Sequence, residues 1–123
     1  MQPGDILFAR IEQHDQTYKI RPCLVLRMSH TVGKGPTVTV AYGTSQRATP
    51  EETQPWQLLL RPEDGPSAWS VTGLDHATVF CFDRRFVLSG YQLKKAKLVG
   101  SLHISVAERV ERVIAAAVKR GWH

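Results

Sequence analysis

Residues 37–42 read Thr37-Val38-Thr39-Val40-Ala41-Tyr42, an alternation of polar and apolar side chains. A period of two residues is typical of a strand with one buried face, because successive side chains of a strand point to opposite sides. The residues before it, Val32-Gly33-Lys34-Gly35-Pro36, contain the glycines and the proline expected of a turn between antiparallel strands. This stretch therefore predicts a hairpin in a β-sheet.

Two earlier stretches predict strands beside it. Residues 6–11 (Ile-Leu-Phe-Ala-Arg-Ile) follow a Pro-Gly-Asp turn, and residues 21–28 begin with Arg21-Pro22, where a missing backbone N–H does least harm. The segment between them, residues 13–17, is wholly polar, so we expect an exposed loop. We expect these three strands to lie close together in one sheet.

The later part of the chain predicts two more strands, at residues 79–82 and 98–102, and a helix. Short apolar runs occur at residues 56–60, 79–82 and 98–102, separated by a polar segment and by a predicted loop at 61–67. Ser105 and Glu108 have the spacing of a capping box, and Gly121 is placed to end the helix that follows. Its apolar residues recur at helical spacing on one face: Val106, Val110, Val113, Ile114, Ala117 and Val118. Its charged residues fall mostly elsewhere, which predicts a solvated face, with partner binding as the alternative.

These elements predict an α+β fold, mainly β: a small closed or half-open barrel with a C-terminal amphipathic helix. The chain has 123 residues, 42% of them hydrophobic and 22% charged, which is ordinary for a globular protein. This length is sufficient for one core and too short for two of usual size, so we expect residues 1–123 to form a single domain.

Charge and cysteine content restrict the compartment and the partners. A formal net charge of +5 attracts polyanions, so nucleic acid is the first partner to consider, although solubility alone also explains such a charge. Cys23 and Cys81 each lie in an apolar run, which predicts buried free thiols rather than a disulfide framework. The N-terminal residues lack the pattern of a signal peptide, and no apolar run reaches the roughly 18 residues of a membrane span. We therefore expect a cytoplasmic protein that does not contact a membrane.

The sequence contains no common cofactor or metal motif. It lacks a Gly-rich phosphate loop, HExxH and GxSxG. Its histidines are scattered without the spacing of zinc ligands: His14, His30, His76, His103 and His123. We therefore predict neither a metal site nor a cofactor.

A basic residue and a hydroxyl lie at the ends of two predicted strands. Arg21 begins the second strand and Thr44 follows the third, so they can converge if these strands are neighbours. A guanidinium holds a phosphate through forked hydrogen bonds, and a hydroxyl donates to a phosphate oxygen. The pair can form a phosphodiester clamp. In the other interpretation, Arg21 is a solvated charge and Gly43-Thr44-Ser45 an ordinary turn.

Three motifs together resemble the MazF/PemK toxins. They are Gly4-Asp5-Ile6-Leu7-Phe8, Arg21-Pro22-Cys23-Leu24-Val25-Leu26, and Val38 to Tyr42 followed by Gly43-Thr44-Ser45, in the order and spacing of that family. Residues 72–80 are similar to the Gly-Leu segment that precedes a late strand there. The family's late Asp-Gln-x-Arg motif is represented at best by Asp83-Arg84-Arg85.

The resemblance implies an SH3-like barrel, usually dimeric, that cleaves single-stranded RNA without a metal ion and is silenced by a cognate antitoxin. It assigns Arg21 and Thr44 to the scissile phosphate. Attack by the ribose 2′-hydroxyl also needs a base, for which His14, Glu12 and Asp83 are the candidates. We further expect RNA to contact Lys19, Ser45, Gln46 and Arg84.

Two other functions remain open at this stage. The same barrel can act without catalysis, by binding a protein target as the gyrase-inhibiting CcdB toxins do, and such a binder has no need of the Arg21 and Thr44 pair. Alternatively, a basic module of this kind can bind RNA without cutting it. Trp56 and Trp69 can stack on RNA bases, although aromatic residues at such positions more often belong to a core or an interface.

Overall fold

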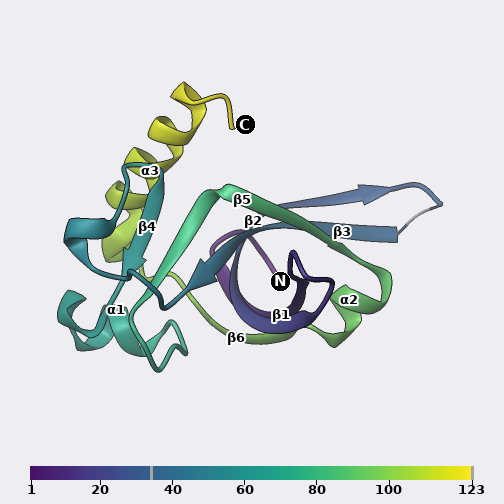
Figure 1. Cartoon of the computed structure of the whole chain (residues 1–123), viewed down its shortest axis with the longest axis horizontal. Coiled ribbons are helices and arrows are strands. Elements are labelled where there is room, and N and C mark those ends of the chain that lie inside the picture. The colour runs from purple at the N-terminus through teal and green to yellow at the C-terminus, as the bar shows by residue number, and fades with distance from the viewer. Residues whose placement is uncertain (34, 123) are drawn as a thin grey trace.

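The computed structural model describes residues 1–33 and 35–122, in which six strands form one antiparallel sheet. The strands are β1 (Asp5–Glu12), β2 (Tyr18–Thr31), β3 (Gly35–Thr44), β4 (Gln57–Leu60), β5 (Thr78–Ser89) and β6 (Lys97–Ser101). Their order across the sheet is β4-β5-β3-β2-β1-β6 (Figure 1). The prediction that the first three strands are neighbours is therefore confirmed. Lys34 of the predicted turn and His123 lie outside the described residues.

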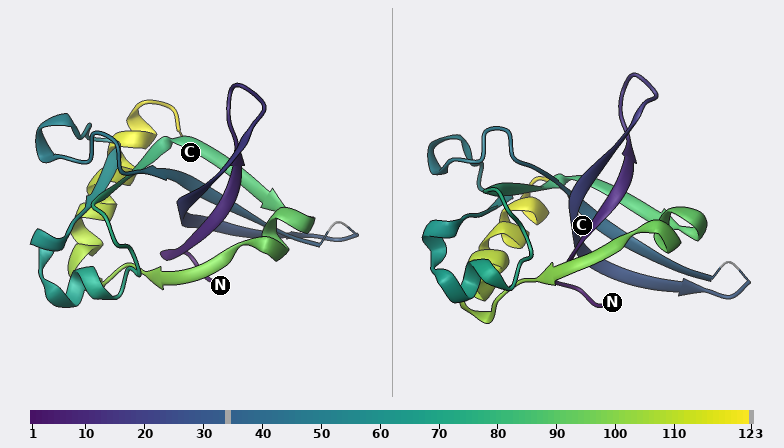
Figure 2. Two further views of the ribbon diagram at one scale, coloured as in Figure 1. Left: turned by 60° about the horizontal axis from the view of Figure 1, so that its bottom comes forward. Right: turned by 90° about the horizontal axis from the view of Figure 1, so that it is seen from below.

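The sheet curls into a half-barrel whose edges are β4 and β6 (Figures 1 and 2). The register shifts between β1 and β6, between β2 and β3, and between β3 and β5, and the extra residues lie in β6, β2 and β5, where they bend these strands. The edge strand β6 also contacts the rest of the chain through backbone hydrogen bonds: Ser101 N–H donates to Val71 O at 2.8 Å, and the following Leu102 N–H donates to Gly4 O at 2.9 Å. The expected fold class, mainly β with a half-open barrel and a C-terminal helix, is confirmed.

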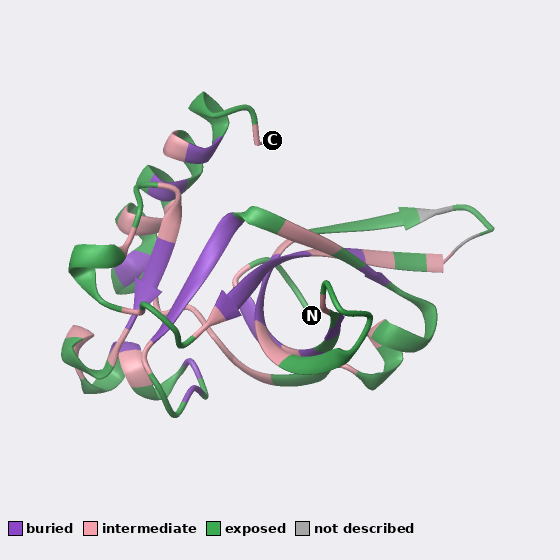
Figure 3. Cartoon of the chain, in the orientation of Figure 1, coloured by how far each residue is buried: buried purple, intermediate pink, exposed green. Residues whose placement is uncertain are grey.

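Both faces of the sheet are buried along part of its length. Ile6, Leu24 and Phe80 belong to a core between the sheet and the C-terminal helix, whereas Leu7 and Val25 belong to a second core inside the curved part. Adjacent residues such as Ile6 and Leu7 thus enter different cores, so β1 has no polar face at this point. Figure 3 shows the buried residues concentrated along β4, the first part of β5 and the inner side of the C-terminal helix.

Three α-helices occur in the described residues: α1 (Pro66–Ser70), α2 (Gly90–Lys95) and α3 (Ala107–Lys119). The expected loop at 61–67 is therefore partly wrong, since it contains the 3₁₀ turn Pro62–Asp64 and the start of α1. Neither α1 nor α2 was predicted, because one or two turns are too short to show a helical period. None of the helices described is long and apolar enough to cross a membrane.

The start of α3 differs from the capping box expected at Ser105. Ser105 lies in a 3₁₀ turn (Ile104–Val106), where its N–H donates to His103 Nδ1 at 3.1 Å, and α3 itself begins at Ala107. Ser105 is thus inside the turn that precedes the helix, and the N-cap position of α3 is Val106, so Ser105 does not cap α3. The predicted end is confirmed: Gly121 has φ +89°, and Gly121 N–H and Trp122 N–H donate to Val118 O and Ala117 O in a Schellman motif.

The buried face of α3 is narrower than its sequence predicts. Val106, Val113 and Ala117 are buried. Ile114 and Val118, however, are 46% and 44% exposed. The reason is that α3 packs mainly on two strands, β4 and β5. Arg109, expected on the solvated face, instead lies 3.2 Å from Asp64 and joins α3 to the turn after β4.

Candidate functional site

The register of β2 and β3 places Arg21 opposite Thr44. Cys23 is paired with Tyr42 at the end of the ladder, and continuing that register by two residues on each strand sets Arg21 against Thr44. Because side chains alternate between faces, Arg21, Thr44 and Tyr42 all belong to the same face of the sheet. The ladder itself ends at Cys23 and Tyr42, so the clamp formed by Arg21 and Thr44 stays a prediction.

Gly43 allows the two strands to come close at this point. A Cβ atom added at Gly43 would lie 2.7 Å from Pro22 O and 2.7 Å from Phe80 Cε1. Such distances are far inside van der Waals contact, so any larger residue would push β3 away from β2 and β5. The glycine before Thr44 therefore has a packing reason: it lets β3 lie close to Pro22 of β2 and Phe80 of β5.

The Arg21 side chain is half-buried and keeps an unused donor. Its guanidinium carbon lies 5.9 Å from the centre of the Tyr42 ring, and its Nε is buried without a hydrogen-bond partner among the described residues. A buried N–H normally donates a hydrogen bond, so this Nε is available to an acceptor atom of a ligand. A guanidinium stays charged at any physiological pH, which suits it to an anion.

The Thr44 hydroxyl is oriented by the turn that follows it. Gln46 N–H donates to Thr44 Oγ1 at 3.1 Å, which occupies an acceptor site of that oxygen and leaves the hydroxyl proton free to be donated. Thr44 and Gln46 both line a cavity of about 430 Å³ with Asp83 and Arg84. The hydroxyl is therefore available to a ligand in this cavity.

A bulge in β5 brings Asp83 and Arg84 to the same place. Ala41 is paired with Arg85, but its neighbour Tyr42 is paired with Cys81, so residues 82–84 have no partner on β3. Arg85 Nε holds the bulge by donating to Phe82 O at 2.8 Å, and burial, together with the nearby Arg27, lowers the pKa of Arg85. The extra residues let Arg84 reach 5.4 Å from the Tyr42 ring centre. Tyr42 thus has two guanidinium groups against its ring.

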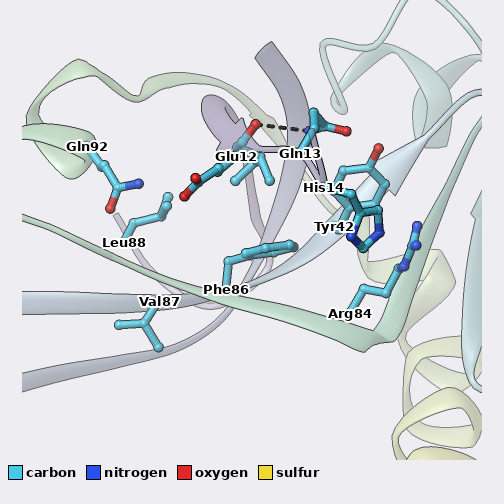
Figure 4. Close-up of a pocket in the computed structure, with 10 residues that line it drawn as sticks. Glu12, Gln13, His14, Tyr42, Arg84, Phe86, Val87, Leu88 and Gln92 are labelled. Atoms are coloured by element: carbon cyan, nitrogen blue, oxygen red, sulfur yellow. Dashed lines mark hydrogen bonds between the residues drawn. The ribbon is translucent and has the colours of Figure 1, made fainter. Parts of the chain in front are cut away.

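A second cavity, also of about 430 Å³, adjoins the first at Tyr42 and Arg84, which line both. Its walls include Glu12 and His14 from the end of β1 and the following loop, Phe86 from β5, and Gln92 from α2. Figure 4 shows His14 beside Tyr42 and Arg84, with Gln92 at the far end. The three candidate bases are therefore divided: Asp83 lines the cavity of Thr44, and Glu12 and His14 line the other.

Two of the predicted RNA contacts lie outside both cavities. Lys19 is exposed and pairs with Ile11 near the β1–β2 loop, on the face of Arg21, while Ser45 is exposed in the turn after β3. The structure groups Thr44, Gln46, Asp83 and Arg84 around one cavity and places His14 in the adjoining one. Arg21 lines neither cavity and reaches the site through the Tyr42 ring, 5.9 Å from its guanidinium carbon. Lys19 and Ser45 lie at the margin.

Several residues of the site were missed by sequence reasoning. Tyr42 was assigned only to the strand, yet it forms the floor between the two cavities. Gln57 lines the first cavity and its Nε2 lies 3.5 Å from Cys81 Sγ, and Arg47 enters the same cavity from a turn with φ 57°. An aromatic residue directly before a Gly-Thr turn was the one available signal. The others depend on which strands pair.

Both tryptophans considered for base stacking pack against the core. Trp56 also meets the ring of Trp122 edge-on at a centre distance of 5.7 Å, and the Arg120 guanidinium lies 4.1 Å above Trp56. These residues tie β4 to the end of α3. This packing fits Trp56 and Trp69 as core or interface residues rather than as platforms for RNA bases.

The thiols are free, and no metal site is apparent in the described part of the chain. Cys23 and Cys81 are both buried, and burial raises the pKa of Cys23 to about 12 and also raises that of Cys81. Among residues 1–33 and 35–122, no three His, Cys, Asp or Glu side chains are grouped to hold a metal ion. The polar groups that line the two cavities include a guanidinium, a hydroxyl, carboxylates and an imidazole.

The fold is that of solved toxin structures. The Mycobacterium tuberculosis toxin MazF-mt6 superposes with a TM-score of 0.64 and 19% identity, over 94% of this chain and 96% of that one. A mycobacterial endoribonuclease in complex with its cognate antitoxin gives a TM-score of 0.64 at 17% identity, covering 100% and 99% of the two chains. MazF from Deinococcus radiodurans gives 0.59 at 14% identity, over 97% and 96%. A comparison with curated protein sequences gave no match.

The fold is a curled antiparallel half-barrel with a helix packed at one end, and two adjoining cavities meet on it at Tyr42 and Arg84. This combination defines a small toxin-like barrel. Residues 2–118 match the family described as PemK-like, MazF-like toxin of type II toxin-antitoxin system. The chain belongs to this family of toxins, as its Gly-Asp-Ile, Arg-Pro and Gly-Thr-Ser motifs predict.

Proposed function

We propose that the protein is a toxin endoribonuclease that cleaves single-stranded RNA without a metal ion and is neutralised by a cognate antitoxin. Family membership supports this proposal, as do two structural neighbours: a mycobacterial endoribonuclease in complex with its cognate antitoxin, and MazE-MazF from Deinococcus radiodurans. The observation that carries it is the Arg21 Nε, a buried donor without a partner, on the strand residue opposite Thr44.

In the proposed reaction the ribose 2′-oxygen attacks the adjacent phosphorus, and the bond from phosphorus to the 5′-oxygen breaks. The 2′-hydroxyl proton passes to a base, and the 5′-oxygen takes a proton from a solvent water molecule as it leaves. Arg21 stabilises the charge on the phosphorane, and Thr44 positions a phosphate oxygen by donating its hydroxyl proton. Arg84, above the other part of the Tyr42 ring, supplies a second positive charge. DNA lacks the 2′-hydroxyl and is not a substrate.

Three residues are candidates for the base: Asp83, His14 and Glu12. Asp83 shares a cavity with Thr44, whereas His14 and Glu12 line the adjoining cavity beyond Tyr42 and Arg84. The substitutions D83N, E12Q and H14Q, each followed as a pH–rate profile, separate them. Only the substitution of the base should remove the rise of the cleavage rate with pH that wild type shows.

We propose Lys19, Ser45, Gln46 and Arg84 as further RNA contacts of a single toxin domain, residues 1–123, acting in the cytoplasm. Free thiols at Cys23 and Cys81 suit a reducing compartment. We also propose that two copies form a two-fold dimer, so that one RNA groove runs across both subunits. Light scattering at micromolar concentration tests this: a stable monomer contradicts it.

Purified protein incubated with single-stranded RNA in EDTA tests the enzymatic proposal. The expected products have 2′,3′-cyclic phosphate and 5′-hydroxyl ends, and the same sequence made of DNA stays intact. A requirement for added divalent metal contradicts the mechanism. Growth arrest by a protein that binds RNA without cutting it, or that leaves RNA alone, would instead favour the two non-catalytic alternatives.

A further inference from the structure

The positive charge of this protein is concentrated in one segment. Residues 84–107 contain five of the sixteen lysines and arginines and none of the eleven aspartates and glutamates. The rest of the chain carries eleven charges of each sign and is neutral, so the whole net charge of +5 belongs to this segment. An excess so localised acts as a directed attraction for a polyanion rather than as a general aid to solubility.

Three of these charges lie together at α2 and the start of β6. Lys94 and Lys95 end α2, Lys97 begins β6, and all three are exposed. The ion pairs among residues 1–33 and 35–122 involve Arg61, His76 and Arg109, so the three lysines are not neutralised by a carboxylate there. Exposed lysines without acidic neighbours are available to phosphates.

An exposed aromatic side chain accompanies the lysines. Tyr91 is 67% exposed, and Lys95 Nζ lies 5.4 Å from the centre of its ring. A large apolar ring left in solvent beside cations is the combination that single-stranded nucleic acid uses, since bases stack on the ring and phosphates meet the charges. We name Tyr91, Lys94, Lys95 and Lys97 the α2 platform.

The cavity beside the candidate site extends to α2, the helix that carries Tyr91, Lys94 and Lys95. Arg84 lines one end, Gln92 of α2 lines the other, and Phe86 lies between them on β5 (Figure 4). Five residues of strand separate Arg84 from the end of β5 at Ser89, a distance of about 17 Å at roughly 3.3 Å per residue. Glu12 is the one carboxylate that lines this cavity, and it comes from β1, not from β5 or α2. The wall from Arg84 to α2 is thus free of negative charge.

We infer that the α2 platform binds the single-stranded RNA beyond the cut site, with Tyr91 stacking on a base and Lys94, Lys95 and Lys97 holding phosphates. This inference rests on the proposed function for the class of ligand. It adds that the substrate is a strand several nucleotides longer than the step that is cut, and that affinity for this extension is separable from cleavage.

The test measures binding of two uridine oligonucleotides whose 2′-oxygens are methylated, which prevents cleavage. One has about twelve nucleotides, within the length that comparable single-strand sites span, and the other about three. The variant K94Q/K95Q removes two platform charges. The control R112Q/K119Q removes two exposed charges from α3, which lies at the opposite end of the molecule in Figures 1 and 2.

For the long oligonucleotide, K94Q/K95Q should bind about tenfold or more weakly at 0.1 M salt, and the slope of log affinity against log salt should fall by about 1.4. Its affinity for the short oligonucleotide should stay unchanged, and the control variant should match wild type on both. Y91A should lose about tenfold on the long oligonucleotide, while Y91F keeps the affinity.

Unchanged affinity and slope in K94Q/K95Q would overturn the inference, as would an equal loss in the α3 control, which means a diffuse charge effect. A parallel titration with polyglutamate covers an acidic protein as the ligand: loss of polyglutamate binding with RNA binding intact would reassign the platform. These results are independent of cleavage in EDTA. Platform-dependent binding without cleavage contradicts only the proposed enzyme, and cleavage with platform-independent binding contradicts only the platform.

Discussion

Replacing Arg21 by alanine should remove most of the RNA cleavage while leaving the fold at least as stable as before. The contact between the guanidinium and Tyr42, at 5.9 Å, is worth about 0.5–1 kcal/mol to the fold. Against this, the substitution removes an Nε that is buried without a partner, and an unsatisfied buried group costs about 1–3 kcal/mol. The two effects oppose each other, so the free energy of unfolding should stay the same or rise by up to about 2 kcal/mol.

The effect of the same substitution on catalysis should be much larger. Loss of one donor to the charge that develops in the transition state costs on the order of 10²–10³ in rate. R21K keeps the charge but not the forked donors, so it should fall between wild type and R21A. T44V, nearly isosteric and without the hydroxyl, should lose activity more mildly.

The assay pairs single-turnover cleavage of a labelled RNA with thermal unfolding of each variant. Growth arrest on overexpression gives the same comparison in cells. If R21A cleaves RNA and arrests growth as wild type does, with equal melting temperatures, the role assigned to Arg21 is refuted and inhibition of a protein target becomes the better explanation.

Three further predictions concern the structure around the site. G43A should lower the free energy of unfolding by about 1–3 kcal/mol, because its Cβ would lie 2.7 Å from Pro22 O; urea unfolding no different from wild type would contradict this packing. R109M should lower the free energy of unfolding by about 1 kcal/mol, because the Arg109–Asp64 pair is partly screened by solvent. D64N should lower it less in the R109M background than in wild type, and additive losses in this double-mutant cycle would mean that the two residues do not interact. Stability should fall as the pH rises above about 8.5 by up to about 1.4 kcal/mol per unit for Cys23, because the unfolded thiol ionises there while the folded one has a pKa of about 12. C23A should flatten this alkaline decline, and an unchanged decline would show that other groups cause it.

The elements and the family could be read from the sequence because they depend on local patterns. The alternation at residues 37–42 fixed a strand, since the two faces of a strand differ wherever one is buried. Gly121 could be predicted to end the helix because the helix ends in a left-handed backbone conformation, which glycine adopts most easily. The motifs around Arg21 and Thr44 were sufficient to indicate a MazF/PemK toxin. In contrast, the start of α3 was wrong, because a 3₁₀ turn capped by His103 competes with the box expected at Ser105.

Only the tertiary structure decided how the site is assembled. The motif named Arg21 and Thr44, but the β2–β3 register makes them opposite each other, and no local pattern specifies a register between distant strands. The bulge that brings Arg84 to Tyr42 likewise exists only as a mismatch between β3 and β5. The division of the candidate bases between two cavities follows from that pairing as well. The period of two shows only on which face of its own strand a residue lies. Contacts between strands depend on long-range packing, which forms only when the chain folds.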